Sequence, residues 1–344
     1  MSAGHRITIA QARAYAAEVL EHFGTAPANA DIVAQALVAA EADGLPSHGL
    51  ARLPSYGVMV RAGKIDGAAV PTLRRAAPSV VAVDAANGFA YPAIHMAEEA
   101  LVPVVRETGI AIAGVRRSSH FGVAGHPVER LAEAGFVAMA FTNAPASIAP
   151  WGGSAPVFGT NPIAFATPVP GRPPAVVDLS VSKVARGYIL AAAQKGEPIP
   201  EGWALDADGK PTTDAKIGLA GTMVPMGEAK GTALAFMVEI LSAAVNAATF
   251  SMDASSFFNG EGPPPAIGQT IIAFDPSRTA GPGYLDHLLR LVESIEGQEG
   301  ARLPGTRRIA ARAKAEAEGV LVTPALEREL AGHGFAGTRF HTAA

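Results

Sequence analysis

The sequence contains no cysteine in 344 residues. Disulfide bonds, thiolate metal sites and a cysteine nucleophile are therefore excluded. A chain of this length without cysteine does not depend on an oxidising compartment. Its start, MSAGHRITIAQARAYAAEVL, also lacks the basic residues and the continuous apolar stretch of a secretory signal. We therefore expect a cytoplasmic protein.

Charged residues are scarce. They make up 17% of the chain, whereas hydrophobic residues make up 49%. Much of the chain must therefore be buried in a core or at a subunit interface. The net charge is -4, with acidic and basic residues interspersed. This pattern offers no basic patch for a polyanion, so we expect neither nucleic acid nor an anionic membrane as a partner.

One segment is nearly free of charge. Residues 231–250 (GTALAFMVEILSAAVNAATF) carry only Glu239, which lies near the centre, and no Trp or Tyr anchors flank them. A membrane span places its charges and aromatic anchors differently. The segment therefore predicts a helix that is buried inside a globular core or at a dimer interface.

Several standard ligand-binding motifs are missing. The sequence has no Walker A loop, no H-E-x-x-H and no G-x-S-x-G, and its nine histidines show no metal-ligand spacing. We therefore expect no metal site. The nearest approach to G-x-G-x-x-G is Gly281-Pro282-Gly283, where Asp286 replaces the third glycine, and this favours an ordinary loop. A bound dinucleotide must then be held outside a standard Rossmann turn.

Apolar runs that alternate with helical patterns predict the fold class. The chain begins with helices: Thr8 and Gln11 match a capping box, and residues 29–42 form a second helix that Gly44 ends. Further on, strand-like segments alternate with helical ones, at residues 79–84, 110–115, 136–142, 163–167, 175–179 and 270–275. We predict an α/β fold. Residues 1–75 form a mainly helical subdomain joined by the C-terminal helices of 284–344, and residues 76–283 form a discontinuous cofactor- and substrate-binding region.

The first candidate site follows the second helix. Ser47, His48, Arg52 and Tyr56 lie in GLPSHGLARLPSYG, and the last three are spaced by four residues. If a helix begins here, these three share one face. Histidine exchanges protons near neutral pH, and arginine presents a flat fork suited to a carboxylate. The alternative, a polar helix start with Ser47 as the cap and His48 exposed, stays open on spacing alone.

Two further clusters are polar or rich in glycine. His120 lies in SSHFG (118–122), after an apolar strand, where α/β proteins place ligands, although a surface turn fits equally well. Thr160 lies in a segment with closely spaced Gly and Pro, residues 149–162. Such a segment is either a rigid ligand-binding loop or a buried turn between strands.

Taken together, these segments resemble the malate/L-lactate/sulfolactate dehydrogenase family, which also includes ureidoglycolate dehydrogenase, diketogulonate reductase and the piperideine- and pyrroline-carboxylate reductases. The resemblance covers nearly the whole chain in the expected order. The matching segments are DGLPSHGLARLPSYGVMVRAGKI (43–65), SSHFG (118–122), TN (142–143), APWGG (149–153), GTNPIAFATP (159–168), VVDLSVSKVARG (176–187), GEPIPEGWALDADGKPTTD (196–214), KG (230–231) and LPGTRR (303–308).

The resemblance implies a non-Rossmann, sulfolactate-dehydrogenase-like fold with a mixed sheet flanked by helices. It also implies a homodimer and NADH or NADPH as the hydride donor, with the choice between NAD and NADP open. The implied reaction is hydride transfer between nicotinamide and C2 of a small 2-hydroxy or 2-oxo acid of the malate, lactate or sulfolactate type. The alternative is NADPH-dependent reduction of cyclic imino acids.

Site residues follow from the resemblance position by position. His48 matches the proton donor, with Ser47 beside it, but His120 matches a proton acceptor named in some members, so the choice between the histidines stays open. On the substrate side we place the carboxylate anchor Arg52, with Tyr56 and Thr160. The positions that match cofactor contacts are Asp178, Leu179, Ser180, Lys230, Arg307 and Arg308.

The sequence departs from the family pattern at two places. Tyr188 stands where the cyclic-imine reductases carry an acidic residue, and a tyrosine is not a carboxylate at neutral pH. This counts against the imine substrate. The family pattern G-G-H-K-G reads GEAKG at residues 227–231, so Ala229 replaces a histidine and Glu228 adds an acid. Either change can alter cofactor or substrate preference.

Overall fold

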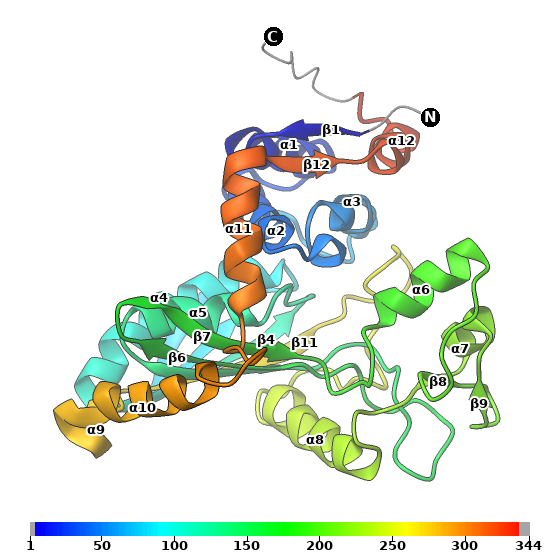
Figure 1. Cartoon of the computed structure of the whole chain (residues 1–344). Coiled ribbons are helices and arrows are strands. Elements are labelled where there is room, and N and C mark those ends of the chain that lie inside the picture. Colours follow the sequence, from blue (N-terminus) through cyan, green and yellow to red (C-terminus); the bar gives the residue numbers. More distant parts are fainter. Residues whose placement is uncertain (1–3, 337–344) are drawn as a thin grey trace.

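A layer of helices forms the N-terminal part of the computed structural model, which describes residues 4–336 (Figure 1). The capping box predicted at Thr8 and Gln11 is confirmed. The backbone N–H of Gln11 donates to the Thr8 hydroxyl at 3.2 Å, and the backbone N–H of Thr8 donates to the Gln11 side chain at 2.9 Å. The second helix starts two residues earlier than predicted, at Pro27, because proline suits the first turn of a helix. The layer consists of α1 (Ile9–His22), α2 (Pro27–Ala42) and α3 (Leu53–Arg61).

The end of the chain returns to this layer. β1 (His5–Ile7) pairs antiparallel with β12 (Val320–Val322), and the core around α1–α3 includes Ala315 and Leu330. These come from α11 (Thr306–Glu318) and α12 (Pro324–Gly332). α10 (Tyr284–Glu296) packs against the sheet instead. The division into a helical part and an α/β region stays a proposal.

A mixed sheet of seven strands lies below the helical layer (Figure 1), as predicted. Only β3 and β4 run parallel, and all other neighbours are antiparallel. Each segment predicted as a strand is a strand here. β2 (Thr72–Ala77) was not predicted. In spatial order the strands are β2, β3 (Val80–Asp84), β4 (Ile110–Ser118), β11 (Ile267–Phe274), β5 (Val137–Thr142), β6 (Ile163–Val169) and β7 (Arg172–Leu179).

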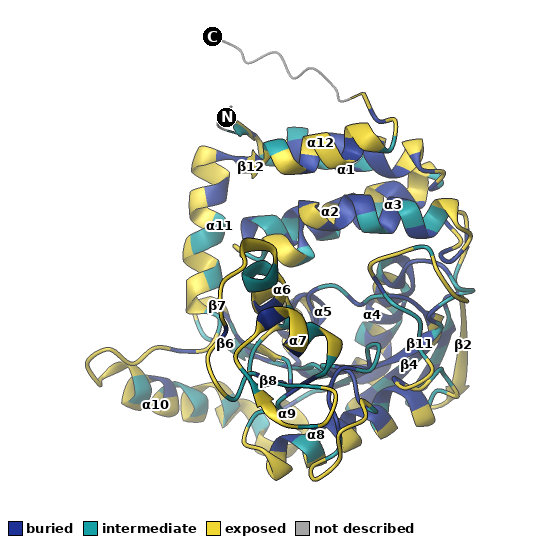
Figure 2. Ribbon diagram, turned by 90° about the vertical axis from the view of Figure 1, so that its right-hand side faces the viewer, coloured by how far each residue is buried: buried dark blue, intermediate teal, exposed yellow. Residues whose placement is uncertain are grey.

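Helices cover both faces of the sheet. α4 (Ala90–Thr108) and α5 (Gly125–Glu133) lie between the sheet and the helical layer, and Figure 2 shows their buried sides within the molecule. α8 (Ala229–Glu239) and a π-helical turn (Ile240–Ala244) lie on the other face. The centre of the sheet is thus largely removed from water on both faces, which accounts for the apolar composition of β5 and β11, whereas β2 at the edge is exposed along its length.

The segment of residues 231–250 is therefore helical up to residue 244, with one face on the sheet, and ends in a turn and an irregular stretch. Glu239, its single charge, is only 5% exposed. No helix within residues 4–336 is long and apolar enough to span a membrane. The outer face of α8 exposes Phe236, and the π-helical turn after it exposes Ile240. A homodimer that covers this face stays a prediction, for which light scattering on the purified protein is the test.

A small lobe completes the molecule on one side (Figure 1). It has its own core, which includes Ile189, Ile199 and Met223. Its elements are α6 (Arg186–Lys195), β8 (Ala204–Leu205), β9 (Pro211–Thr212), α7 (Ala215–Ala220) and β10 (Thr222–Met223). The remaining short elements are the 3-10 turns η1 (Pro46–His48), η2 (Leu50–Arg52) and η4 (Gly281–Gly283), and α9 (Ser277–Ala280).

Candidate active site

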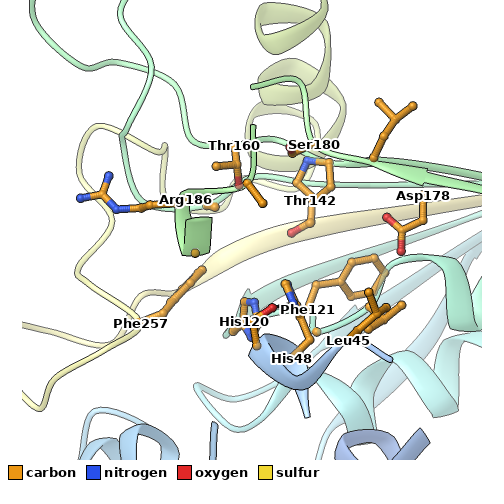
Figure 3. A pocket seen from close by; sticks show the side chains of 18 of the residues that line it. Leu45, His48, His120, Phe121, Thr142, Thr160, Asp178, Ser180, Arg186 and Phe257 are labelled. Atoms are coloured by element: carbon orange, nitrogen blue, oxygen red, sulfur yellow. Dashed lines mark hydrogen bonds between the residues drawn. The ribbon is translucent and has the colours of Figure 1, made fainter. Parts of the chain in front are cut away.

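A cavity of about 1800 Å³ lies where the helical layer, the sheet and the small lobe meet. The turns after α2, the loops after β4 and β5, the end of β7 and the loop before α11 all line it. Figure 3 shows two facing walls, with His48 and His120 on one and Thr142, Thr160 and Ser180 on the other. Ten of the predicted site residues line the cavity, namely Ser47, His48, Arg52, His120, Thr160, Asp178, Leu179, Ser180, Arg307 and Arg308.

The first predicted cluster is not one helix. His48 ends η1, Arg52 ends η2, and α3 begins only at Leu53. Gly49 breaks the run, because its φ of -97° and ψ of -137° are not helical. A side chain at Gly49 would also collide with Glu41, whose carboxylate accepts a hydrogen bond of 2.9 Å from the backbone N–H of Leu50. The fourfold spacing therefore does not create the site, which the two tight turns build instead.

The two histidines are close neighbours. Their ring centroids lie 5.4 Å apart, and Ser47 Oγ lies 3.1 Å from Nδ1 of His48. Burial and, to a lesser extent, the positive charges of Arg52 and His126 lower the pKa of His48 to about 4. Burial, Arg52 and His48 also hold the pKa of His120 well below 6.5. Without a bound anion, both imidazoles are therefore neutral at pH 7.

Arg52 is held rigidly with one part of its guanidinium unused. It is 9% exposed, its Nε donates to the carbonyl of Ser47 at 2.7 Å, and its guanidinium lies 4.7 Å from the ring centroid of Phe258. Its Nη1 is buried and has no hydrogen-bond partner within residues 4–336. A buried, unpaired guanidinium N–H is costly unless a ligand accepts its hydrogen bond. This arrangement suits an anion in the cavity.

A second polar region lies at the end of β7. Asp178 accepts a hydrogen bond of 2.8 Å from the backbone N–H of Gly125 at the start of α5. Burial raises the pKa of Asp178, against the opposing effects of this bond and of Arg308. A side chain at Gly125 would meet both Arg308 and Asp178 within 3.1 Å, so only glycine allows the three groups to approach.

These groups fit a nicotinamide dinucleotide. Arg308 Nη1 is buried and has no hydrogen-bond partner in the described part of the chain. The cavity also exceeds the roughly 300 to 1000 Å³ that suffices for a drug-sized ligand. A dinucleotide together with a small acid needs such a larger space. The residues that can hold the dinucleotide are Asp178, Leu179, Ser180, Arg307 and Arg308.

Below the cavity lies a buried ionic cluster that the sequence patterns did not predict. Arg312 pairs with Glu129 at 2.6 Å and with Asp43, and His126 Nε2 lies 2.9 Å from Asp43. Burial alone would raise the pKa of Asp43, but hydrogen bonds from His126 and Arg312 outweigh it and lower the pKa. The cluster fastens α11 to the end of α2 and to α5, and so fixes the first turn of α11, which carries Arg308. Only Asp43 lay in a segment singled out from the sequence.

Four other positions lie elsewhere. Tyr56 does not line the cavity, and its hydroxyl contacts Nδ1 of His120 from behind. Lys230 is exposed in the first turn of α8, outside the cavity lining. Tyr188 is 66% exposed and lies beside Trp203. The glycine pair 281–283 is a 3-10 turn before α10, away from the cavity.

The site thus combines a buried arginine with an unpartnered Nη1, two adjacent histidines and a cavity large enough for a dinucleotide beside a small acid, an arrangement that suits a dehydrogenase of small acids. Comparison with known proteins agrees. The family model for malate/L-lactate dehydrogenase matches residues 7–331. The chain belongs to this family and is an NAD(P)-dependent oxidoreductase.

Individual relatives cover nearly the whole chain. A (2R)-3-sulfolactate dehydrogenase (NADP(+)) of Chromohalobacter salexigens is 51% identical over 89% of this chain and 91% of its own. A Δ1-pyrroline-2-carboxylate/Δ1-piperideine-2-carboxylate reductase of Pseudomonas aeruginosa is 41% identical over 94% of this chain and 98% of its own. The crystal structure of Δ1-piperideine-2-carboxylate reductase from Pseudomonas syringae matches with a TM-score of 0.89 at 36% identity, covering 95% of this chain and 98% of that one. The predicted fold class is therefore confirmed.

Proposed function

We propose that the protein is an NADP-dependent dehydrogenase of a small 2-hydroxy acid with a second anionic group, of the 3-sulfolactate type. The proposal depends mainly on Arg52. This arginine is buried, and its Nη1 has no hydrogen-bond partner within residues 4–336. Two neutral histidines lie beside it. The 51% identity to a sulfolactate dehydrogenase supports the substrate class.

In this proposal Arg52 binds the C1 carboxylate of the substrate. A bidentate contact with the planar guanidinium fixes the orientation of the neighbouring C2 atom. The Phe258 ring under the guanidinium keeps water from one of its faces. The histidines then lie next to the oxygen on C2.

His48 transfers the proton to or from that oxygen. Its pKa is low in the free protein partly because Arg52 is nearby. A carboxylate bound to Arg52 offsets that positive charge, so it raises the pKa of His48 above its value in the free protein. Binding of the oxo acid therefore prepares His48 to act as an acid, a role that suits a group with a pKa near the working pH.

The cofactor residues are Asp178, Leu179, Ser180, Arg307 and Arg308. Bound NADPH supplies the hydride to C2, and NADP+ accepts it in reverse. Arginine side chains bind phosphate with paired hydrogen bonds. Two neighbouring arginines in the cavity therefore favour NADP, which has an additional phosphate, over NAD. The name of the 51% identical relative, which includes NADP(+), supports the same choice.

Arg186 is the proposed contact for the second anionic group. It lines the cavity at the start of α6, and no carboxylate within residues 4–336 pairs with it. Its one hydrogen bond goes from Nη2 to the carbonyl of Leu219 at 3.2 Å. Figure 3 shows it on the opposite side of the histidines from Asp178. A partly buried guanidinium without an acid favours an anionic ligand.

A second candidate function is the reduction of cyclic imino acids with NADPH. Relatives at 41% identity carry this activity in their names, and so does the solved structure with a TM-score of 0.89. These substrates share the 2-position carboxylate that Arg52 would bind. They carry no second anion, so they would leave Arg186 without a ligand.

The test is a panel of reductions followed at the nicotinamide absorbance band. The substrates are sulfopyruvate, oxaloacetate, pyruvate and the two cyclic imino acids, each with NADPH and with NADH. We expect turnover of sulfopyruvate with NADPH to exceed that of pyruvate. Arg186→Gln should raise KM for sulfopyruvate at least tenfold and leave KM for pyruvate unchanged. Turnover of the imino acids alone would overturn the proposal in favour of the second candidate.

A further inference from the structure

Three side chains from separate elements form a chain of hydrogen bonds that leads away from the cavity. Tyr56 Oη lies 2.6 Å from Nδ1 of His120, and Tyr91 Oη lies 3.0 Å from Tyr56 Oη. Tyr56 is on α3, Tyr91 is in the first turn of α4, and His120 follows β4. None of the roles assigned above uses Tyr91.

All three groups are uncharged at neutral pH. Tyr56 is 1% exposed, and burial raises its pKa above 10. Burial and the contact with Tyr56 hold the pKa of Tyr91 well above 10. Burial also lowers the pKa of His120 well below 6.5. Each phenol therefore keeps its proton, and the imidazole carries one proton on either Nδ1 or Nε2.

The hydrogen-bond chain decides which nitrogen carries that proton. In one direction the Tyr91 hydroxyl donates to Tyr56, and the Tyr56 hydroxyl donates to Nδ1 of His120. Both phenol protons then have an acceptor, and the imidazole carries its proton on Nε2. In the reverse direction Nδ1–H donates to Tyr56 and Tyr56 donates to Tyr91. The Tyr91 proton then needs another acceptor, and none is found within residues 4–336. An unmade hydrogen bond of a buried hydroxyl costs about 1 to 3 kcal/mol, so the first direction is favoured.

We propose that Tyr56 and Tyr91 are positioning residues that hold His120 as the Nε2–H tautomer, so that His120 donates a hydrogen bond to the C2 oxygen of the substrate. This division of roles rests on the proposed function, in which His48 transfers the proton. His120 lines the cavity, and its Nε2 makes no hydrogen bond in the described part of the chain. A neutral N–H aimed at an oxygen stabilises the negative charge that develops there during hydride transfer.

The backbone near His120 is shaped around the Tyr91 hydroxyl. Gly122 has a φ of +75°, and a Cβ at this position would lie 2.4 Å from Tyr91 Oη. Only glycine takes this conformation and leaves that space. The same Cβ would lie 2.7 and 2.9 Å from two carbons of the Tyr91 ring, so the glycine makes room for the ring as well as for the hydroxyl. The loop after β4 is therefore fitted closely to the Tyr91 side chain, which holds its hydroxyl in place.

The test measures the tautomer directly. Nitrogen-15 NMR distinguishes a protonated imidazole nitrogen from an unprotonated one, and the His120 signals are assigned by their loss in His120→Gln. In the wild-type protein with NADP+, we expect Nε2 to be protonated and Nδ1 to be unprotonated. In Tyr56→Phe, and less completely in Tyr91→Phe, we expect a mixture of the two tautomers.

Steady-state kinetics then measure how much Tyr56 and Tyr91 contribute to turnover. Tyr56→Phe should lower kcat about 10- to 100-fold, since a misplaced donor loses stabilisation of the developing charge. KM for the acid and the Kd of NADPH should stay within twofold. Tyr91→Phe should lower kcat about three- to tenfold and have no further effect in Tyr56→Phe, because the two hydroxyls act in series. The control is Tyr284→Phe, which removes a hydroxyl pair with Thr167 away from the cavity.

The outcomes separate this inference from the proposed function. If the wild-type protein reduces no oxo acid but shows the Nε2–H tautomer, the proposed function fails and the positioning by Tyr56 and Tyr91 stands. An Nδ1–H tautomer in the wild-type protein overturns the inference, whatever the activity. So does an unchanged kcat in Tyr56→Phe of an active enzyme.

Discussion

The carboxylate of Glu239 accepts a hydrogen bond of 2.8 Å from the side-chain amide of Asn161, which lies 78 residues earlier in the chain. Ser251 donates to the same carboxylate twice, from its backbone N–H at 2.7 Å and from its hydroxyl at 2.6 Å. Asn143 adds a longer contact of 3.4 Å. Within residues 4–336, no cation pairs with Glu239. The carboxylate thus joins three loops, and two of its partners, Asn143 and Ser251, line the cavity.

Replacement of this carboxylate by an amide should destabilise the protein. In Glu239→Gln an N–H₂ group faces donors that need an acceptor, which costs about 1 to 3 kcal/mol for a buried group. We expect the free energy of unfolding to fall by about that amount, as measured by urea denaturation at fixed protein concentration. Glu293→Gln, on the exposed side of α10, is the matched control. Equal stability of the two variants would show that the network contributes nothing.

Loss of His48 should affect turnover and not folding. A well-placed general acid contributes about two to four orders of magnitude in rate, so His48→Ala should lower kcat by about 100- to 10,000-fold. The Kd of NADPH and the circular dichroism spectrum should match the wild type. Near-normal turnover would transfer the proton-transfer role to His120.

Arg52→Lys should weaken binding of the acid. Lysine keeps the charge but loses the planar fork and the stacking on Phe258, so a bidentate carboxylate contact becomes impossible. We expect KM for the oxo acid to rise about tenfold or more, measured at saturating cofactor. Arg13→Lys, which changes an exposed pair with Asp31, provides the control. An unchanged KM in Arg52→Lys would remove this residue from the substrate site.

Stability should fall in acid because of His48. Its pKa is about 4 in the folded protein and 6.5 as the ordinary value, so the unfolded chain takes up this proton first. The stability from neutral His48 is fully present above pH 6.5 and is lost as the pH falls to 4. The full loss is about 3 kcal/mol.

His48→Gln isolates this contribution. Denaturation at neutral pH and near pH 4 should show a smaller loss of stability in the variant than in the wild type, by about 3 kcal/mol. His95→Gln, at an exposed position of α4, should behave as the wild type. Parallel pH profiles of His48→Gln and the wild type would contradict the burial of an uncharged histidine.

Local sequence patterns predicted much of the fold. The capping box at Thr8, the helix predicted at residues 29–42 and the six predicted strands depend on periodicity and on neighbouring residues, and each formed within a few residues of the expected bounds. The segments around His48, His120 and Thr160 were also recognisable, because polar residues beside Gly and Pro interrupt apolar runs. The structure brings all three segments to one cavity.

Contacts between distant segments were not predictable in this way. The pairing of Arg312 with Asp43 joins residues 269 positions apart, and the contact of Tyr56 with His120 spans 64. The fourfold spacing from His48 to Tyr56 suggested a shared helix face, but Gly49 breaks the helix, and Tyr56 points behind the histidine instead. The single charge in residues 231–250 excluded a membrane span but did not reveal the buried partners of Glu239.

The position of β11 has a consequence for biosynthesis. This strand lies between β4 and β5 at the centre of the sheet, yet it is synthesised after every other strand of that sheet. Until Ile267 and the residues after it leave the ribosome, β4 and β5 are both open edges with apolar side chains, which invites pairing with other nascent chains. A chain arrested just before Ile267 should therefore stay sensitive to protease and bind chaperones. We then expect the yield of active protein to depend on translation speed and chaperone supply, even when the finished fold is stable.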